Sequence, residues 1–524
     1  MRRSGRPVRH ARYAVAFAAL GAGLLALAGC GDSGATAPPA DTIAAVSGDN
    51  QTAAAGTALA APLVVVVKNA SGAPVSGVAV SWTALSGGAA VAPPSSQTDA
   101  NGNASASVTL ASASAQIRAA LTGGASVTFT ATVAGAASAP LVAQLPVPAN
   151  YGIHDTFVRD GLAFTCEWNT GLVIYDVGNG IKGGSPAHPV EVGRIVTSVH
   201  NPSASSGNPQ PSVHNSWWFH NPVSGENRYV FVGEEGPANI GVTATGDIHV
   251  VDVSDLTAPK EVAFFHLPAI AGDSAGTHNF WMDESAQILY AAYYDGGVIA
   301  LDVSGTLAGD LSSRLIASIR PGGAGNTYTW GVQLYNGDLF ATDMLSGFWR
   351  LHFDPAARQF SVVGGGNNVP DRFSSDLWVA NGFAYTGTWG GIARTRDAAG
   401  NVVRGNVIKV WQVSGAPALA DSVVLAGVGT VSDDEVSSDG KYLLATAEGG
   451  NDATKGFYLL SLASPAHPAV TTFVPVPSGD PSFPTGGGLH TGTFATIGGR
   501  RYVFAARNPP SPALLIWDVT DVTQ

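Results

Sequence analysis

Residues 171–177 read Gly-Leu-Val-Ile-Tyr-Asp-Val, and this short apolar pattern returns through the rest of the chain. Six later segments have the same shape: 247–253, 297–303, 347–353, 406–413, 456–462 and 514–519. They follow one another at intervals of roughly 50–75 residues, which is enough for four strands and their turns. The repeats therefore predict a seven-bladed β-propeller over residues 138–524.

The composition also favours an all-β protein. Hydrophobic residues make up 45% of the 524 residues, charged residues only 12%, and glycine occurs 65 times. Glycine-rich, weakly charged chains are typical of turn-rich β structure, and no long stretch has an apolar stripe at helical period.

Short turn sequences accompany the repeats. Residues 252–255 read Asp-Val-Ser-Asp, and Ser-Pro-Ala-His-Pro occurs at both 185–189 and 464–468. Together with the seven strands, these turns resemble LVIVD-repeat β-propellers over nearly all of residues 150–524. Because that family is poorly characterised, the resemblance implies a fold more than a function.

The last repeat unit is one strand short. It holds three strand candidates, at 490–497, 501–506 and 514–519, and then the chain ends. The segment Pro-Leu-Val-Ala-Gln-Leu at 140–145 could supply the fourth. We therefore predict that the two ends of this region pair and close the ring, which leaves no open sheet edge.

Residues 42–135 form a separate unit of short strands. Strand patterns at 62–67, 78–82 and 104–110 alternate with turn signals, which predicts a β-sandwich. Residues 72–82 and 98–104 resemble the bacterial Ig-like domain of invasin- and intimin-type surface proteins. The resemblance implies a spacer or an adhesive module, and the few charges and aromatics favour a spacer.

The first 30 residues carry an export signal. An arginine-rich start is followed by an apolar run too short for a permanent membrane helix, which marks residues 1–29 as a signal peptide. Residues 27–30, Leu-Ala-Gly-Cys, resemble the lipobox of bacterial lipoproteins. This resemblance implies cleavage before Cys30, diacylglycerol on its thiol and acylation of the new amine. Residues 30–41 read as a flexible tether.

These features predict a lipid-anchored protein outside the cytoplasm. Two or three acyl chains give stable membrane attachment. Gly31, rather than an aspartate, follows the lipidated cysteine, which favours the outer membrane over the inner membrane.

The net charge excludes nucleic acid as a partner. It is −12 for the whole chain, from 26 Lys and Arg against 38 Asp and Glu, and −17 once the five arginines of the signal peptide are removed. Phosphate binding needs clustered basic residues. The second cysteine, Cys166, lies in an apolar run, so we expect a buried, inert thiol, no disulfide, and a monomer.

Each propeller unit begins with a recurrent pair of residues. The pairs are His154-Asp155, His214-Asn215, His278-Asn279, Trp330-Gly331, Ser375-Asp376, Asp433-Asp434 and His490-Thr491. The first strand of a propeller blade lines the central channel, so the pairs should lie at one mouth of it. Imidazole is a common ligand of Zn, Cu and Fe, which makes His154, His214, His278 and His490 candidate metal or ligand residues. The alternative is that they hydrogen-bond to neighbouring blades and fix their register.

Carboxylates follow the second strand of several units. Glu167, Glu234, Glu235, Asp343 and Glu448, flanked by Trp168 and Trp389, could form an acidic funnel around the same mouth, although such loop carboxylates are often only solvated.

The motifs of common enzymes are missing from the sequence. We find no serine nucleophile elbow, no phosphate-binding glycine loop and no zinc-protease helix, so no catalytic residue is assigned, no cofactor is certain, and an enzyme is not favoured. The sequence favours a lipid-anchored cell-envelope protein that presents a propeller to an extracellular or periplasmic protein, a glycan or another ligand. The alternative is a protein, or a propeller enzyme, that binds a divalent metal through the four histidines.

Overall fold

A computed structural model describes most of the chain from residue 41 onward. The described ranges are 41–53, 56–111, 115–133, 139–147, 152–198, 212–235, 246–267, 276–366, 372–390, 405–450, 454–477, 487–509 and 511–523. Cys30, the signal peptide and all but the last residue of the tether lie outside them. Within these ranges the search for an apolar helix long enough to cross a membrane finds none.

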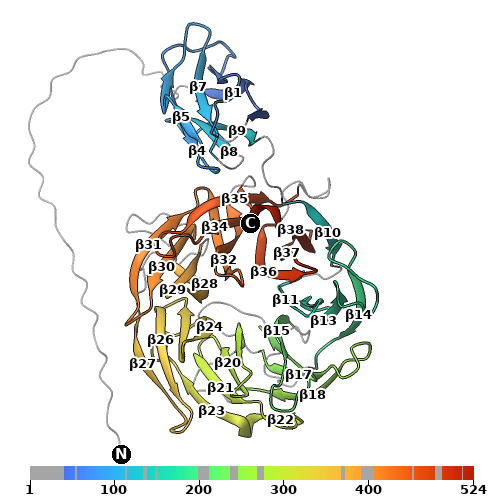
Figure 1. Cartoon of the computed structure of the whole chain (residues 1–524). Helices are drawn as coiled ribbons and strands as arrows, with labels where there is room; N and C mark the ends of the chain where they lie inside the picture. Colours follow the sequence, from blue (N-terminus) through green and yellow to red (C-terminus); the bar gives the residue numbers. More distant parts are fainter. Residues whose placement is uncertain are drawn as a thin grey trace, which may run out of the picture.

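The first unit is a sandwich of two sheets (Figure 1). One sheet has the order β1 (Thr42–Ser47), β3 (Leu63–Lys68), β7 (Asn103–Thr109), β5 (Ala90–Ala92). The other has the order β2 (Gln51–Ala53), β9 (Ser126–Val133), β8 (Ala115–Leu121), β4 (Ala79–Ala84), β6 (Ser95–Gln97). Alternate residues of the strands β3, β4, β7 and β8 face the core, where the rings of Trp82 and Phe129 lie 6.1 Å apart. The predicted sandwich is thus confirmed.

The second unit is a ring of antiparallel sheets whose strands follow one another in the chain. The first sheet is β11 (Asp155–Arg159), β12 (Leu162–Cys166), β13 (Leu172–Asp176), β14 (Val190–Ile195). The second is β15 (Val213–Phe219), β16 (Tyr229–Glu234), β17 (Ile248–Asp252), β18 (Lys260–Phe265), to which β22 (Gly309–Asp310) adds in parallel. The third is β19 (Phe280–Asp283), β20 (Ile288–Ala292), β21 (Val298–Asp302), β23 (Leu315–Ile319).

Four more sheets follow among the described residues. They are β24 (Thr329–Tyr335), β25 (Asp338–Asp343), β26 (Gly347–Asp354), β27 (Gln359–Gly365); β28 (Phe373–Ala380), β29 (Phe383–Trp389), β30 (Val407–Gln412), β31 (Ala418–Val424); β32 (Val428–Val436), β33 (Tyr442–Gly450), β34 (Gly456–Ser461), β35 (Ala469–Pro475); and β36 (Leu489–Ile497), β37 (Arg500–Arg507), β38 (Ala513–Asp518) with β10 (Leu141–Pro146). Two short 3₁₀ turns, η2 (Ser312–Arg314) and η4 (Asp521–Thr523), complete the described elements.

The repeated apolar segment forms the third strand of every sheet in the ring. These strands are β13, β17, β21, β26, β30, β34 and β38. They are buried along most of their length because neighbouring sheets pack on both of their faces. Burial on both sides explains why they read as continuous apolar runs rather than as alternating patterns.

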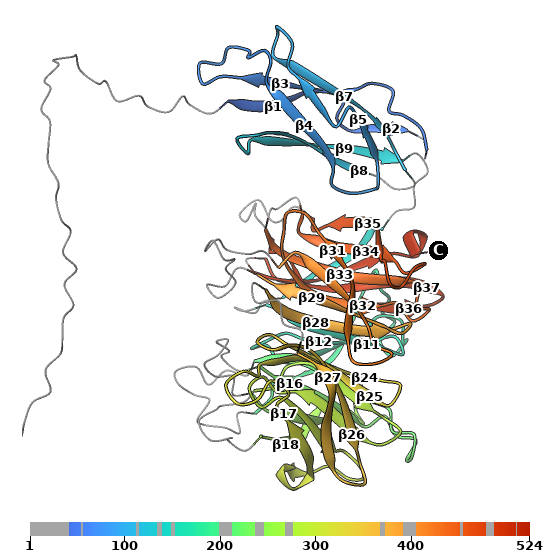
Figure 2. The same cartoon turned by 90° about the vertical axis from the view of Figure 1, so that its left-hand side faces the viewer.

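The ring closes as predicted. β10 pairs antiparallel with β38, with Leu145 opposite Leu514, so a segment before the first sheet completes the last one. The innermost strands contact their neighbours around the ring, and β36 contacts β11 across the junction. In both views the sandwich lies beside the rim of the ring near β35, not across the channel (Figures 1 and 2).

Candidate functional site

Most of the innermost strands are irregular at the residue pair that the sequence singles out. In β15, Val213 pairs with Glu234 and Asn215 with Gly233, so His214 has no partner of its own in the ladder. Trp330 in β24 and His490 in β36 are bypassed in the same way. In β28 and β32 the register shift spans two residues. A β-bulge of this kind turns side chains away from their regular direction.

Two of the predicted histidines lie just before their strands. The backbone N–H of His154 donates to the carbonyl of Cys166, and that of His278 donates to the carbonyl of Ala292, each at 2.8 Å. Each residue pair can therefore place its first side chain at the channel mouth and its second deeper in the channel. Cys166 itself is fully buried, as predicted, and burial raises the pKa of its thiol.

The four histidines meet at one mouth of the channel although they come from four different sheets. The ring centres of His154 and His214 lie 3.6 Å apart, those of His214 and His278 4.1 Å, and those of His154 and His490 4.2 Å. Two tryptophans lie between His278 and His490 and complete the ring of aromatic side chains. The ring centres of Trp330 and His278 lie 4.0 Å apart. Trp389 then bridges between Trp330 and His490.

These side chains surround a cavity of about 420 Å³, which we call the mouth cavity. Its lining consists of Ile153, His154, Trp168, Glu235, Tyr294, Trp330, Trp389, Glu448, His490 and Asn508. His214 and His278 are almost completely buried behind it, with exposed fractions of 1% and 2%.

Five ring nitrogens of three histidines make no hydrogen bond of normal geometry within the described part of the chain, although the rings contact the backbone of His214 and Trp330 and the side chains of Asn215 and Asn279. They are Nδ1 of His154 and both ring nitrogens of His214 and His278. Burial, reinforced by the neighbouring imidazoles, holds the pKa of each of these rings well below its usual value. The rings are therefore neutral at pH 7, which is the form of imidazole that binds metal ions.

His490 differs from the other three because it has a carboxylate partner. Its Nδ1 lies 2.7 Å from Oε2 of Glu448, which also accepts a hydrogen bond from Asn508. Burial lowers the pKa of His490, but the attraction of Glu448 outweighs it and the net pKa is raised. His490 is thus held in place and favours its charged form.

Glu235 brings a carboxylate to the uncharged histidines. It accepts a hydrogen bond from the Tyr294 hydroxyl, and burial raises its pKa to about 7. Ligand atoms of His154, His214 and Glu235 all lie within 4.8 Å of one another, and no other group of three or more potential metal ligands this compact occurs among the described residues. Metal–nitrogen bonds of about 2.0–2.1 Å need only a modest contraction of such a set.

Three of the five carboxylates expected in the acidic funnel lie elsewhere. Glu167 accepts hydrogen bonds from Thr165 and Tyr175 inside its own sheet. Glu234 is held by Thr197 and lies 3.4 Å from the buried His249. Asp343 is buried and accepts backbone N–H bonds, including those of Tyr328, Leu345 and Ser346. Only Glu235 and Glu448 of the five line the mouth cavity, together with the expected Trp168 and Trp389.

Comparison with known proteins supports both sequence resemblances. Residues 43–139 match the model of the bacterial Ig-like domain (group 1), and residues 242–266 match that of the LVIVD repeat. No curated protein matches the chain.

Solved β-propellers resemble the chain only distantly. The Cps50 (Swd1) β-propeller domain of Myceliophteria thermophila is 10% identical, with 71% of this chain and 100% of that chain covered and a TM-score of 0.43. A chain of the mitotic checkpoint complex is 13% identical, with 73% and 95% covered and a TM-score of 0.47. The computationally designed Ika8 protein is 8% identical, with 72% and 88% covered and a TM-score of 0.42. None of these likenesses bears on what this chain binds.

Proposed function

We propose that this chain is a lipid-anchored cell-envelope protein whose seven-bladed propeller binds a divalent transition-metal ion at the channel mouth. His154, His214 and Glu235 would hold the ion, with His278 and His490 beside them. A β-propeller with an LVIVD repeat is a binding scaffold, and the histidine cluster supplies the reason to name a metal as its ligand. The expectation that the propeller presents a surface to a protein or glycan stays a prediction.

The observation that carries the proposal is the set of buried imidazole nitrogens without partners. A buried polar group left without a hydrogen bond costs about 1–3 kcal/mol, and His214 and His278 together contribute four such atoms. The rings of His154 and His278 do interact with the backbone of the neighbouring sheets at His214 and Trp330, as a register-fixing role requires, but these contacts leave the nitrogens named above without a hydrogen bond of normal geometry. A metal ion gives some of them a partner and makes their convergence favourable.

The residues around the cluster also suit a metal site. Ligand carboxylates and histidines are normally oriented by a second layer of hydrogen bonds. Tyr294 orients Glu235, while Glu448, which accepts a hydrogen bond from Asn508, holds His490. Neutral imidazole and carboxylate are ligands that suit Zn, Cu, Ni and Fe.

Metal analysis of the full chain, purified in a mild detergent, tests the proposal. We expect about one ion per chain after dialysis against Zn²⁺ and removal of free metal. The His214→Ala variant should lose the ion, whereas the exposed His188 is a matched control and His188→Ala should keep it. Circular dichroism of both variants shows whether the fold is retained. Metal content no higher than that of a chelator-treated sample would contradict the proposal.

The lipid anchor is tested separately. Residues 27–30 support it, and metabolic labelling with a fatty acid should label the wild-type chain and leave Cys30→Ser unlabelled. The variant should also move from the membrane to the aqueous fraction, because the acyl chains supply the attachment. Equal labelling of both chains would contradict the anchor.

A further inference from the structure

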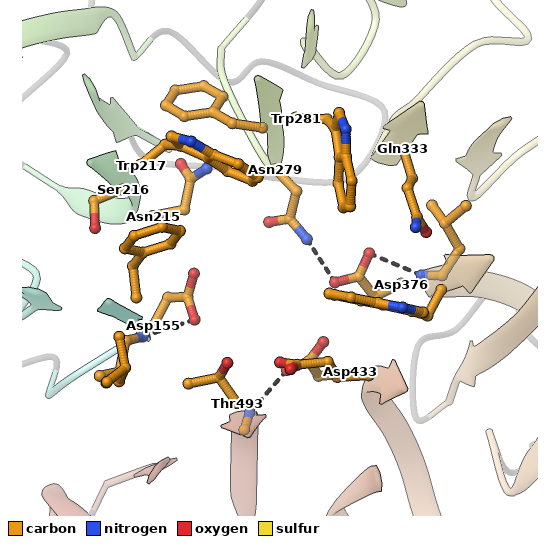
Figure 3. A pocket seen from close by; sticks show the side chains of 18 of the residues that line it. Asp155, Asn215, Ser216, Trp217, Asn279, Trp281, Gln333, Asp376, Asp433 and Thr493 are labelled. Atoms are coloured by element: carbon orange, nitrogen blue, oxygen red, sulfur yellow. Dashed lines mark hydrogen bonds between the residues drawn. The ribbon is translucent and has the colours of Figure 1, made fainter. Parts of the chain in front are cut away.

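A second cavity of about 270 Å³ lies between the innermost strands of the ring (Figure 3). Three carboxylic acids from three different sheets, Asp155, Asp376 and Asp433, surround it, and Glu435 lines it as well. Asp155 and Asp376 are the second members of their residue pairs. Only Asp155 belongs to the same residue pair as one of the four histidines; Asp376 and Asp433 come from strands β28 and β32, which bring no histidine to the mouth.

Aromatic side chains form another wall of this cavity. The ring centres of Phe157 and Trp217 lie 5.2 Å apart, those of Trp217 and Trp281 5.5 Å, and those of Trp281 and Trp378 5.8 Å. Each aromatic residue stands two positions after the second member of its pair, so it faces the channel one level further along the strand. We call this enclosure the carboxylate–aromatic chamber.

No lysine, arginine or histidine is among the residues that line the chamber. Neutral groups donate to its carboxylates: Asn279 Nδ2 donates to Asp376 at 2.6 Å, and the N–H of Gly492 donates to Asp433 at 2.8 Å. Asp376 and Asp433 also hydrogen-bond to each other, and the charge of His490 acts on Asp433 from outside the lining. Toward the opposite mouth, Arg159 and Arg501 are each paired with a carboxylate of their own, Glu284 and Asp439.

Asn215 adds a buried polar side chain to the lining, with 3% of the residue exposed. Its Oδ1 makes no hydrogen bond of normal geometry with the described residues and lies close to Gly233 and to the ring of His214.

We infer that the carboxylate–aromatic chamber binds a small organic cation of the alkylammonium class. Burial raises the pKa of Asp376 and that of Asp433, which favours their neutral forms in the empty chamber. An ammonium group favours their ionised forms by supplying the counter-charge, and the faces of Trp217, Trp281 and Trp378 attract the same charge. The volume lies at the small end of ligand pockets, which suits a compact amine. This site is distinct from the proposed metal site and does not depend on it.

Two other kinds of guest fit the chamber less well. A single metal ion needs ligand atoms close together, and the compact ligand set of the described residues is that of His154, His214 and Glu235, not that of the three aspartates. A neutral sugar could stack on the tryptophans, but it carries no charge that both the acids and the tryptophan faces attract.

Isothermal titration of the full chain with choline tests the inference, with EDTA present so that the mouth cavity holds no metal. The control ligand is 3,3-dimethylbutan-1-ol, which has the shape of choline without its charge. We expect choline to bind with a Kd of about 1 mM or tighter, and the alcohol to bind at least tenfold more weakly.

Variants locate the binding in the chamber. Asp433→Asn and Trp281→Leu should each weaken choline binding about tenfold, while Glu226→Gln, which changes an exposed carboxylate outside the chamber, should leave it unchanged. Equal binding of choline and the alcohol, binding of glucose in place of choline, or no binding of choline would each overturn the inference. The two wild-type titrations decide the matter even if a variant fails to fold.

Discussion

Two carboxylates at the channel mouth act on the histidines in opposite ways. Glu235 lies beside neutral imidazoles and has a pKa raised by burial to about 7, so it is only partly ionised near neutral pH. Glu448 pairs with His490 and favours its charged form. Glu235 is thus available as a metal ligand, whereas Glu448 supplies the counter-charge of His490.

Metal affinity should therefore depend on pH through Glu235. The ligand form is the carboxylate, so affinity should fall about tenfold per pH unit below the pKa of about 7 and level off above it. Titration calorimetry with Zn²⁺ between about pH 6 and 8 measures this slope, and Glu235→Gln should remove the part that Glu235 contributes. Affinity that rises as the pH falls would contradict this role.

The pairing of His490 with Glu448 should contribute stability that depends on pH. Because the folded pKa of His490 is raised, the contribution is fully present below its unfolded pKa of about 6.5 and is lost as the pH rises through the folded pKa. Glu448→Gln should lower the free energy of unfolding by about 3 kcal/mol at low pH, and by less at high pH. Chemical denaturation at several pH values measures the difference, and a destabilisation that grows with pH would contradict the assignment.

At the scale of single elements, the bulged inner strands decide where the functional side chains point. The recurrent residue pairs could be found in the sequence because one pair occurs at the start of each propeller unit, and four of the pairs contain a histidine. The bulges could not be predicted from the sequence, because a bulge depends on how two strands pair and not on the composition of either strand. The carboxylate–aromatic chamber was missed for a related reason: its side chains alternate along bulged strands and are separated by hundreds of residues in the chain.

Glycine in the second strand makes room for one bulge. A Cβ at Gly233 of β16 would lie 2.2 Å from Oδ1 of Asn215 and 2.7 Å from Oγ1 of Thr277. Gly233→Ala should therefore destabilise the fold by about 1–3 kcal/mol and displace Asn215 from the chamber. Thermal denaturation measures the first effect and choline titration the second. Gly415, where a Cβ would meet nothing within 4 Å, provides the control, and equal stability of Gly233→Ala and Gly415→Ala would contradict the account.

At the scale of the whole molecule, closure of the ring keeps both channel sites intact. The third strands and the closing segment could be predicted because continuous apolar runs and a missing strand are visible in the sequence. The acidic funnel was predicted only in part, because Glu167 and Asp343 found partners within their own repeat units and Glu234 found Thr197, which follows the last strand of the first sheet. Which loop carboxylates become buried depends on contacts between segments far apart in the chain.

Removing the closing strand should open the ring. A chain that begins at residue 139 keeps β10, whereas one that begins at residue 148 loses it and exposes the edge of β38. The shorter chain should unfold at a markedly lower temperature and associate through the free edge, which light scattering and thermal denaturation would detect. If the two chains are equally stable and equally monomeric, β10 does not close the ring.

X-ray absorption at the zinc edge of the Zn²⁺-loaded full chain tests the central claim most directly. The account predicts nitrogen and oxygen ligands at about 2.0–2.1 Å with the multiple-scattering signal of at least two imidazoles, and no such bound-zinc signal in His214→Ala, which should not retain the ion. A spectrum without imidazole ligands, or one that His214→Ala leaves unchanged, would contradict a metal site at the channel mouth.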